Sequence, residues 1–499
     1  MSKIQHYLCT FDLKKIMSLH PQYEAVIGLE CHIQLLTKSK MYSSDSTSFG
    51  DWPNTHISEI TLGYPGTLPR VNKKAIEFAI RLGLAVQANI HSFNGFARKN
   101  YFYPDLPKGY QITQDKTPIC TGGKIQFRLK NGERKEVRLI RIHMEEDAGK
   151  NLHDIDPFES LVDFNRAGTP LLEIVSEADI RSGEEAYYYL QEIRKLVRYL
   201  EICDGNMEEG SLRCDVNISV RKKGEEKFGT KVEVKNLNSF KNVQRAIDYE
   251  TQRQIEMIER GETIVSETRS FDAINGITFS LRSKEMANDY RYFPEPDLPP
   301  VIITNQHINA IKSVLPPLPN ELFEKYTKEY GLSEYDATVL TEDKQIALWF
   351  NNLCQYTNNY KAAANWLNVI IKGYLNENAI DLVDFILKPQ QIAKIIQLID
   401  DDKISHSAAA QKLFPALLQT PDKDIEALCQ ELDLFKNTNT DEILPLIEEV
   451  LNKYPEKVDE YKRGKKGLIG LFVGEVMKLS KGKADPKLVN QFVREKLDA

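Results

Sequence analysis

Cysteine is scarce in this sequence, and the cysteines that occur form none of the usual disulfide or metal patterns. There are seven of them, an odd number, and no Cys-x-x-Cys occurs. Such usage is typical of a reducing compartment and argues against a disulfide framework or a cysteine-based zinc site. No apolar run approaches the roughly 20 residues that cross a bilayer, and no signal-peptide core begins the chain. We therefore expect a cytoplasmic protein without membrane contact.

The sequence signatures of several large enzyme classes are also absent. The nearest approach to a phosphate-binding P-loop is 205–210, but Ser211 follows where a lysine is needed. Neither a Gly-x-Ser-x-Gly elbow nor a His-Glu-x-x-His motif occurs. Nothing marks a covalent nucleophile. The chemistry that remains is a carboxylate-held metal beside fixed lysine and arginine, which is the equipment of phosphoryl transfer.

Length and composition favour a globular protein of several domains. A chain of 499 residues is too long for one ordinary core, so we expect about three domains. Apolar residues make up 41% and charged residues 27% of the chain, as in globular proteins. The net charge of −7 gives no general attraction to nucleic acid, so any RNA contact must come from local basic patches.

Strand and helix signals divide the chain. Alternating patterns prevail up to residue 298, whereas short amphipathic helices follow one another from Asn305. Residues 1–20 form an extension in this interpretation, and Met17 could be the true start because the organised pattern begins only at Tyr23. We predict an α+β fold: a mixed or antiparallel sheet with flanking helices in 21–298, an all-α helical domain in 299–400 and an all-α tail domain in 401–499.

Several elements can be predicted individually. Asn131-Gly132 between the alternating segments 124–130 and 134–144 indicates a hairpin. Asn72 can cap a helix that runs to about residue 89. Further helices are expected at 182–202, from the end of a 231–240 strand to about 260, and at 320–330, 333–353, 361–374, 389–400, 405–415, 422–433, 440–452, 467–480 and 485–497.

Residues 23–35 read as a half-buried strand because every odd position is apolar. Among the even positions, Glu30 and His32 are next-nearest neighbours and must point to one face. A carboxylate beside an imidazole on a rigid strand can hold a hard cation or a phosphate-bearing substrate. A merely exposed strand face with two polar residues is the alternative.

Acidic residues recur in later stretches. Three consecutive acids end the second hairpin strand, in 143–150, and 207–209 repeats the Met-Glu-Glu of 144–146. A strand around 171–175 carries one inward acid, Glu173. Solvated turns rich in acids are common, so these stretches alone do not decide for a site.

Residues 214–221 alternate cleanly and place Asp215 and Asn217 on one strand face, where they are suited to bind Mg²⁺. A solvent-exposed strand face would show the same alternation.

The run 98–112 places three aromatics among basic residues. This suits the binding of a nucleotide or an RNA end, or equally an aromatic loop packed on a sheet. A basic cluster at 462–466 indicates either a phosphate-backbone contact or a solvated helix start.

Taken together, these stretches are similar to the B subunits of the glutamine-dependent aspartyl/glutamyl-tRNA amidotransferases (GatB). The similarity covers essentially everything after residue 20, and it is specific because many long runs occur in one order. The tail at 467–489 resembles the tRNA-associated YqeY-type helical domain. The matching runs are 27–32, 98–111, 143–150, 163–177, 208–217, 231–240 and 289–296.

The resemblance implies a heterotrimer whose amidase-type A subunit releases ammonia from glutamine and passes it through a tunnel, with a small C subunit. The B subunit would be a ligase component that uses ATP and Mg²⁺ to activate the side-chain carboxylate of misacylated Glu-tRNA(Gln) or Asp-tRNA(Asn). Ammonia then displaces the acyl phosphate, giving Gln-tRNA or Asn-tRNA. In this comparison 21–298 is a catalytic cradle and 401–499 a YqeY-like tRNA-binding tail.

The matching motifs also imply roles for single residues. The expected catalytic residues are Glu30, His32, Lys99, Glu146 and Glu209. The expected metal or ammonia-path residues are Glu30, His32, Glu146, Glu173, Glu209 and Asp215. The expected phosphate contacts are Lys99, Lys150, Arg213 and Lys235. A dication and fixed cations are needed because phosphorylating a carboxylate brings two anions together.

This chain departs from the resemblance in one loop. Many relatives carry a four-cysteine zinc site after the first strand, but residues 43–68 contain no cysteine. We therefore expect no zinc there.

Two other functions compete with the transamidase component. A non-catalytic tRNA-binding scaffold would not need its acids to converge. A stand-alone carboxylate–amine ligase would need its own source of ammonia, and the lack of a nucleophile motif makes a partner protein the simpler hypothesis.

Overall fold

The structure, a computed structural model, describes residues 20–152, 155–156, 158–283, 290–436, 440–480 and 484–498. The chain forms two compact units, Met1–Asn320 and Glu321–Ala499. The sequence places a boundary after residue 298, but β17 (Val301–Ile302) pairs with β3 (Phe93–Asn94), and α5 (Asn305–Lys312) packs on α2 (Lys73–Ala85), so both stay with the first unit. The expected extension, 1–20, lies outside the described residues except for His20.

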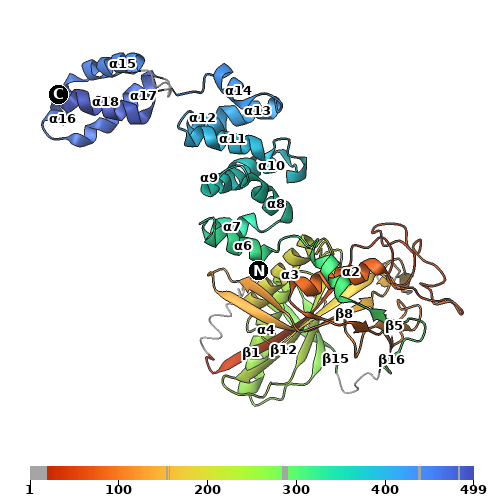
Figure 1. The fold of residues 1–499 in the computed structure, drawn as a ribbon. Helices are drawn as coiled ribbons and strands as arrows, with labels where there is room; N and C mark the ends of the chain where they lie inside the picture. The colour runs from red at the N-terminus through yellow and green to blue at the C-terminus, as the bar shows by residue number, and fades with distance from the viewer. Residues whose placement is uncertain are drawn as a thin grey trace. The chain divides into compact units, whose positions relative to one another are not determined.

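A mixed sheet of 10 strands forms the centre of the first unit, which confirms the predicted α+β class (Figure 1). Its strands are β1 (Tyr23–Gln34), β2 (Asn89–Ile90), β6 (Cys120–Thr121), β7 (Lys124–Arg128), β8 (Arg134–Glu146), β11 (Pro170–Ser176), β12 (Leu212–Lys222), β13 (Val232–Lys235), β14 (Glu267–Asp272) and β15 (Ile277–Ser283). They run in the order β15-β14-β13-β12-β1-β11-β8-β6-β2, with β7 paired to β8. The β13–β14 pair is parallel, and the other pairs are antiparallel.

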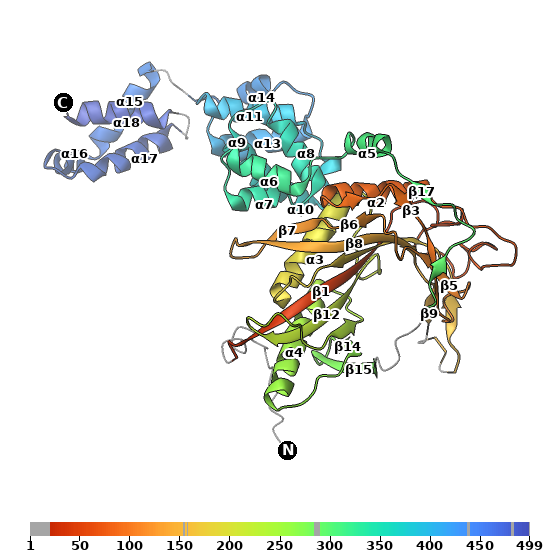
Figure 2. The same cartoon turned by 60° about the horizontal axis from the view of Figure 1, so that its bottom comes forward.

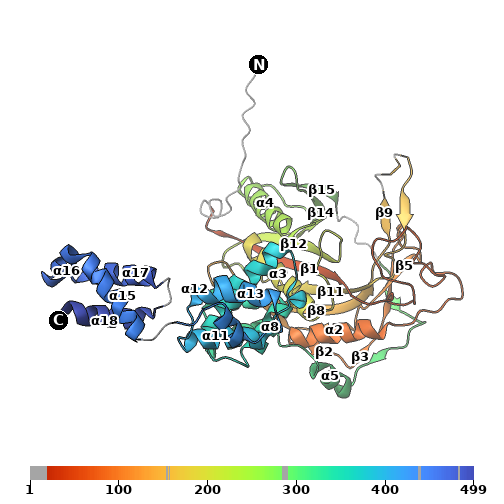
Figure 3. The ribbon, with the colours of Figure 1, turned by 90° about the horizontal axis from the view of Figure 1, so that it is seen from above.

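Smaller sheets flank this one. A three-stranded sheet has the order β16-β4-β5, and β9 pairs with β10 in a hairpin that stands out from the rest of the unit (Figure 3). The bounds of these strands are β4 (Ala97–Asn100), β5 (Tyr110–Thr113), β9 (Lys150–Leu152), β10 (Leu161–Asp163) and β16 (Phe293–Pro294).

Strand β1 lies between β11 and β12, and its alternation is the predicted one. The apolar residues at its odd positions are buried, including Ile27, Leu29 and Ile33, all with no exposed surface. They face α3 (Gly183–Tyr199) and α4 (Phe240–Glu259), whose apolar stripes complete the core (Figure 2). Burying each large aliphatic side chain contributes about 1.5–3 kcal/mol, so the polar even positions are left on the opposite face.

The other predicted elements of the first unit are present. The Asn131-Gly132 turn joins β7 to β8, as predicted, with Gly132 at a φ of 85°. Asn72 caps α2 through its side chain, but the helix ends at Ala85 rather than near 89 because Gln87 has a φ of 59°. Helices α3 and α4 begin at the side-chain caps Ser182 and Ser239.

Helices make up the second unit, as the sequence predicts. The expected helix 333–353 is two helices, because Thr341 ends the first and the Asp343 side chain caps the second. A separate helix, α16, precedes the basic cluster and is missing from the sequence-based expectation. The helices are α6 (Pro319–Lys328, which begins in the first unit), α7 (Glu334–Leu340), α8 (Lys344–Leu353), α9 (Tyr360–Asn365), α10 (Lys372–Asn378), α11 (Pro389–Asp400), α12 (His406–Ala408), α13 (Phe414–Gln419), α14 (Ile425–Glu431), α15 (Thr440–Lys453), α16 (Pro455–Lys462), α17 (Ile469–Leu479) and α18 (Pro486–Asp498).

The last four helices have a hydrophobic core of their own, which includes Ile443, Phe472 and Val493. Among the described residues, no helix combines the length and the hydropathy that a membrane crossing requires. The cysteines of the described residues, from Cys31 to Cys429, are free thiols.

Asp248 gives a testable stability prediction. It lies on α4 against the start of α3, where a side chain on Gly183 would approach its Oδ1 to 2.5 Å. Burial raises the pKa of Asp248 to about 7. Because the folded protein then holds the proton more tightly than the unfolded chain, its stability falls as the pH rises from about 4 to 7.

We expect Asp248→Asn to raise the free energy of unfolding by about 2 kcal/mol at pH 8 and to change it little at pH 4. Urea denaturation at the two pH values measures this. Glu256→Gln, exposed on the same helix, is the control. Equal effects of Asp248→Asn at both pH values would contradict the prediction.

Candidate functional site

The polar face of the large sheet, opposite α3 and α4, carries a row of ionisable side chains. His32 on β1 is paired with Glu173 on β11, and Glu173 is paired with His143 on β8. Directly paired residues of neighbouring strands point to the same face. Glu145, two residues beyond His143, joins this row because side chains alternate along β8.

Four side chains form the first acidic group. The Nε2 of His32 lies 3.3 Å from Glu173 Oε2 and 3.6 Å from Glu145 Oε1. The Nε2 of His143 lies 3.2 Å from Glu173 Oε2 and 3.7 Å from Glu145 Oε2. One ligand atom each of His32, Glu145 and Glu173 falls within a 4.8 Å span, which is a donor set that divalent cations use.

The acids raise the pKa of both histidines. Burial opposes the charging of His143, but its hydrogen bonds to Glu145 and Glu173 outweigh burial and raise the pKa of His143 to about 9. The same acids raise the pKa of His32 despite its burial. Burial works against ionisation of Glu173 as well, but the hydrogen bonds from His143 and His32 lower the pKa of Glu173 well below its usual range. The first acidic group therefore pairs two carboxylates with two imidazoles.

A second acidic group adjoins the first. Glu30, two residues before His32 on β1, comes within 4.8 Å of Asp215 on β12 and Glu233 on β13. Two residues along a strand span about 7 Å, so the two groups are close neighbours. Asn217 donates from Nδ2 to Glu30 Oε1 at 2.8 Å, and its buried Oδ1 has no hydrogen-bond partner among the described residues. This amide oxygen is a further oxygen donor beside the acids.

Lysine and arginine side chains border both groups. The Nζ of Lys235 lies 2.5 Å from Asp215 Oδ2 and 3.2 Å from Glu233 Oε1. Burial disfavours its charge, but these acids raise the pKa of Lys235. Arg213, paired across the strands with His32, makes a 2.9 Å ion pair with Asp147. Burial opposes ionisation of Asp147, but the guanidinium of Arg213 contributes most to lowering its pKa.

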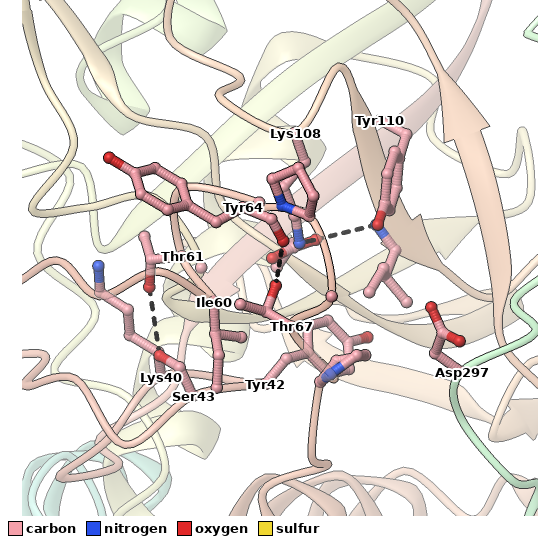
Figure 4. A pocket seen from close by; sticks show the side chains of 17 residues that line it. Lys40, Tyr42, Ser43, Ile60, Thr61, Tyr64, Thr67, Lys108, Tyr110 and Asp297 are labelled. Atoms are coloured by element: carbon pink, nitrogen blue, oxygen red, sulfur yellow. Dashed lines mark hydrogen bonds and ion pairs between the residues drawn. The ribbon is translucent and has the colours of Figure 1, made fainter.

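The first unit also has a pocket of about 230 Å³, whose lining includes Lys108 and Tyr110 (Figure 4). Glu146 lines it, pointing away from Glu145 because the two are neighbours on one strand. The carboxylate of Glu146 pairs with the Lys108 ammonium and accepts a hydrogen bond from the Ile112 amide at 3.0 Å. Lys40 also lines the pocket, and burial lowers the pKa of Lys40 to about 8.

The structure brings together part of the residue set expected from the sequence. Glu30, His32, Glu173 and Asp215 lie in the two acidic groups, with Arg213 and Lys235 beside them. Glu146 belongs to neither group, since it faces the pocket and Glu145 takes the position beside His32.

Three other expected residues make no ion pair with the two acidic groups among the described residues. Glu209 is exposed in a turn, and Lys150 is exposed at the start of β9, so neither belongs to the acidic groups of the described chain. Lys99 lies over the rings of Tyr290 at 4.9 Å and Tyr101 at 5.7 Å. This cation–π contact keeps its ammonium among aromatics, as the run 98–112 indicates.

Sequence reasoning missed Glu145 and Glu233, although a signal for each was present. Extending the alternation of β8 by two residues puts Glu145 on the face of His143. The alternation of β13 puts Glu233 on the face of Lys235. Lys108 lies in the aromatic run, but nothing in the sequence pairs it with Glu146.

Comparisons with known proteins agree with this architecture. The family described as GatB/GatE catalytic domain matches residues 25–309. The family described as GatB domain matches residues 348–497, which begin before the tail expected from 401.

Individual relatives match along almost their whole length. The B subunit of the aspartyl/glutamyl-tRNA(Asn/Gln) amidotransferase from Thermodesulfovibrio yellowstonii is 49% identical over 472 residues, or 95% of this chain and 98% of that protein. The protein of the same name from Alkalilimnicola ehrlichii is 50% identical over 482 residues, or 96% of this chain and 100% of that protein. That of Caldicellulosiruptor saccharolyticus is 48% identical over 480 residues, or 96% of this chain and 99% of that protein.

The first acidic group gives a prediction on metal binding. We expect Glu173→Gln to weaken Mn²⁺ binding by about 10- to 100-fold, because it removes a carboxylate ligand and the orienting partner of His32. Mn²⁺ titration followed by electron paramagnetic resonance measures the affinity. Glu136→Gln, exposed on the same strand as Glu145, is the control that keeps wild-type affinity. Wild-type affinity in Glu173→Gln would show that the group is not a metal site.

Proposed function

We propose that this chain, which belongs to the GatB/GatE family, is the component of a tRNA-dependent amidotransferase that activates the side-chain carboxylate of a misacylated tRNA. The substrates are Glu-tRNA(Gln), Asp-tRNA(Asn) or both, and ATP supplies the phosphoryl group. An amidase-type A subunit, together with a small C subunit, supplies ammonia from glutamine. The overall reaction forms a C–N bond with glutamine as the nitrogen donor.

The observation that carries this proposal is the convergence of two acidic groups on one face of the sheet. His32, Glu145 and Glu173 form one group, and Glu30 with its partners on β12 and β13 forms the other. Concentrating this many carboxylates costs free energy through mutual repulsion and desolvation. The arrangement is explained if the face binds divalent cations and anionic substrates, because bound cations offset the repulsion between the carboxylates.

The residues present fit a divalent cation at each group. The first offers an imidazole and two carboxylates, and the second offers three carboxylates with the Oδ1 of Asn217 beside them. Oxygen ligands of this kind are those that Mg²⁺ prefers. When bound, Mg²⁺ would supply positive charge that lets a phosphate and a carboxylate approach each other.

Lysine and arginine side chains supply further positive charge beside the acids. Lys235 and Arg213 are held in place by Asp215 and Asp147, so their charge is directed at the sheet face before a substrate arrives. Lys99, held among tyrosine rings, is the cation that we assign to the incoming carboxylate or phosphate. A carboxylate oxygen of the aminoacyl group attacks the γ-phosphorus and the P–O bond to ADP breaks. Ammonia then attacks the acyl carbon and phosphate leaves.

The pocket with Glu146 and Lys108 suits the passage of ammonia. Its polar lining can donate and accept hydrogen bonds, and Glu146 directly follows Glu145 of the first acidic group on β8. We therefore assign Glu146 to the ammonia path rather than to the metal.

The basic cluster after α16 is the candidate contact for tRNA. Lys462, Arg463, Lys465 and Lys466 are exposed. Lys465 and Lys466 form ion pairs with Glu460 and Asp498. Lys462 and Arg463 make no ion pair with any described residue, so they are the better candidates for the phosphate backbone.

A non-catalytic tRNA-binding scaffold explains less of the structure. It would bind RNA through basic residues and would not need Glu30, Glu173 and Asp215 on one face. The second Met-Glu-Glu, at 207–209, does fit the scaffold alternative, since both of its acids are exposed.

A variant series in the reconstituted three-subunit complex tests the proposal. With glutamine, Mg²⁺, ATP and Glu-tRNA(Gln), the wild type should cleave ATP only when the misacylated tRNA is present. We expect Glu145→Gln and Glu233→Gln each to lower this turnover by about 100-fold, because each removes charge that stabilises the phosphoryl transition state. Filter binding of the tRNA should stay at the wild-type level.

Glu136→Gln is again the matched control, with wild-type turnover expected. Full turnover in both site variants would move the chemistry away from these acids. Loss of tRNA binding in parallel with turnover would favour the scaffold.

A further inference from the structure

A hydrogen-bonded cluster lies behind one wall of the pocket. The Oδ2 of Asp45 accepts hydrogen bonds from the hydroxyls of Ser43 at 3.0 Å, of Ser58 at 2.8 Å and of Thr61. The hydroxyls of Ser43 and Thr61 are themselves 3.2 Å apart. Burial opposes ionisation of Asp45, but these three hydroxyls outweigh it and lower the pKa of Asp45. One carboxylate oxygen thus holds three points of a loop that has no strand or helix of its own.

The same loop is fixed from a second direction by Lys40. The Nζ of this lysine, which has 1% of its surface exposed, donates to the carbonyl oxygens of His56 at 2.6 Å and Phe164 at 3.3 Å. The Lys40 amide also donates to the Asp45 carbonyl at 3.0 Å. The buried Lys40 ammonium donates to two carbonyl oxygens, and the Asp45 carboxylate accepts from three hydroxyls. Together these hydrogen bonds fix the loop.

The loop held in this way touches Lys108. Residues 58–64 form a tight turn in which the Leu62 amide donates to the Ser58 carbonyl at 3.0 Å. At Gly63, with a φ of 70°, a Cβ would lie 2.7 Å from Lys108 Cγ. The turn therefore packs directly on the lysine that pairs with Glu146. In Figure 4, Ser43 and Thr61 lie on one side of the pocket and Lys108 on another.

We propose that Asp45 is a positioning residue, which holds the turn 58–64 against Lys108 and so sets the shape of the pocket. This inference rests on the proposed function in one respect, namely that ammonia is the molecule that passes through the pocket. Asp45 belongs to neither acidic group of the described residues. It acts through the turn 58–64, which packs on Lys108 at Gly63.

The experiment compares two nitrogen sources in the reconstituted complex with Glu-tRNA(Gln), ATP and Mg²⁺. Glutamine delivers ammonia from the amidase partner, whereas saturating ammonium chloride supplies it from solution. We expect Asp45→Ala and Thr61→Val to lower the glutamine-dependent amidation rate by about tenfold, because misplacing a positioned group by a fraction of an ångström is costly. The rate with ammonium chloride and the hydrolysis of glutamine should stay at wild-type levels.

Two variants calibrate this result. Asp45→Asn keeps an oxygen that accepts from the hydroxyls, so it should restore part of the glutamine-dependent rate. Thr55→Val removes an exposed hydroxyl of the same loop that bonds only to the Trp52 carbonyl among the described residues, and it should behave as wild type. Circular dichroism shows whether Asp45→Ala is folded, and Thr61→Val, which keeps the side-chain volume, carries the test if it is not.

The outcomes separate the two proposals. Equal loss with both nitrogen sources would mean that the cluster only maintains the fold, and no loss with either source would mean that it does not position the pocket. Both results overturn the role of Asp45. A wild-type complex that amidates with neither source contradicts the proposed function instead, whatever the variants do.

Discussion

The pairing of β1 with β11 on one side and β12 on the other is the constraint on which the site depends. Side chains alternate along every strand, so a shift of one residue in either pairing would exchange the core and the polar face. With the observed registers, His32 meets Glu173, and Glu30 meets Asp215. The apolar residues of β1 hold this register by packing against α3 and α4, so the hydrophobic core and the acidic face are enforced by the same contacts.

Concentrating acids on that face carries an electrostatic cost that the protein reduces in several ways. Two histidines of raised pKa lie beside Glu145 and Glu173, and lysine and arginine border the neighbouring acids. Such a site is less stable than an apolar face would be, and proteins retain arrangements of this kind where function requires them. The imidazoles of His32 and His143 lie against these carboxylates, and His32 would have to be neutral to bind a metal.

The sequence predicted the architecture and part of the site, and the limits of that prediction have physical causes. Period-2 alternation identified the strands and placed Glu30 and His32 on one face. Choosing between Glu145 and Glu146 required knowing how far β8 continues. A three-acid run looks like a solvated turn by composition, whereas in the fold Glu145 and Glu146 are the buried end of a long strand and point to opposite faces.

By itself, the sequence determined the alternation of each strand, the change to helices after residue 300 and membership of the family, because these depend on local spacing and on residue identity. Only the tertiary structure decided which side chains meet. Glu146 finds Lys108, and Asp45 gathers three hydroxyls, through loop paths that no periodicity describes. The physical reason is that local patterns fix the face on which a residue lies, while its partners depend on strand register and on loops closed by long-range hydrogen bonds.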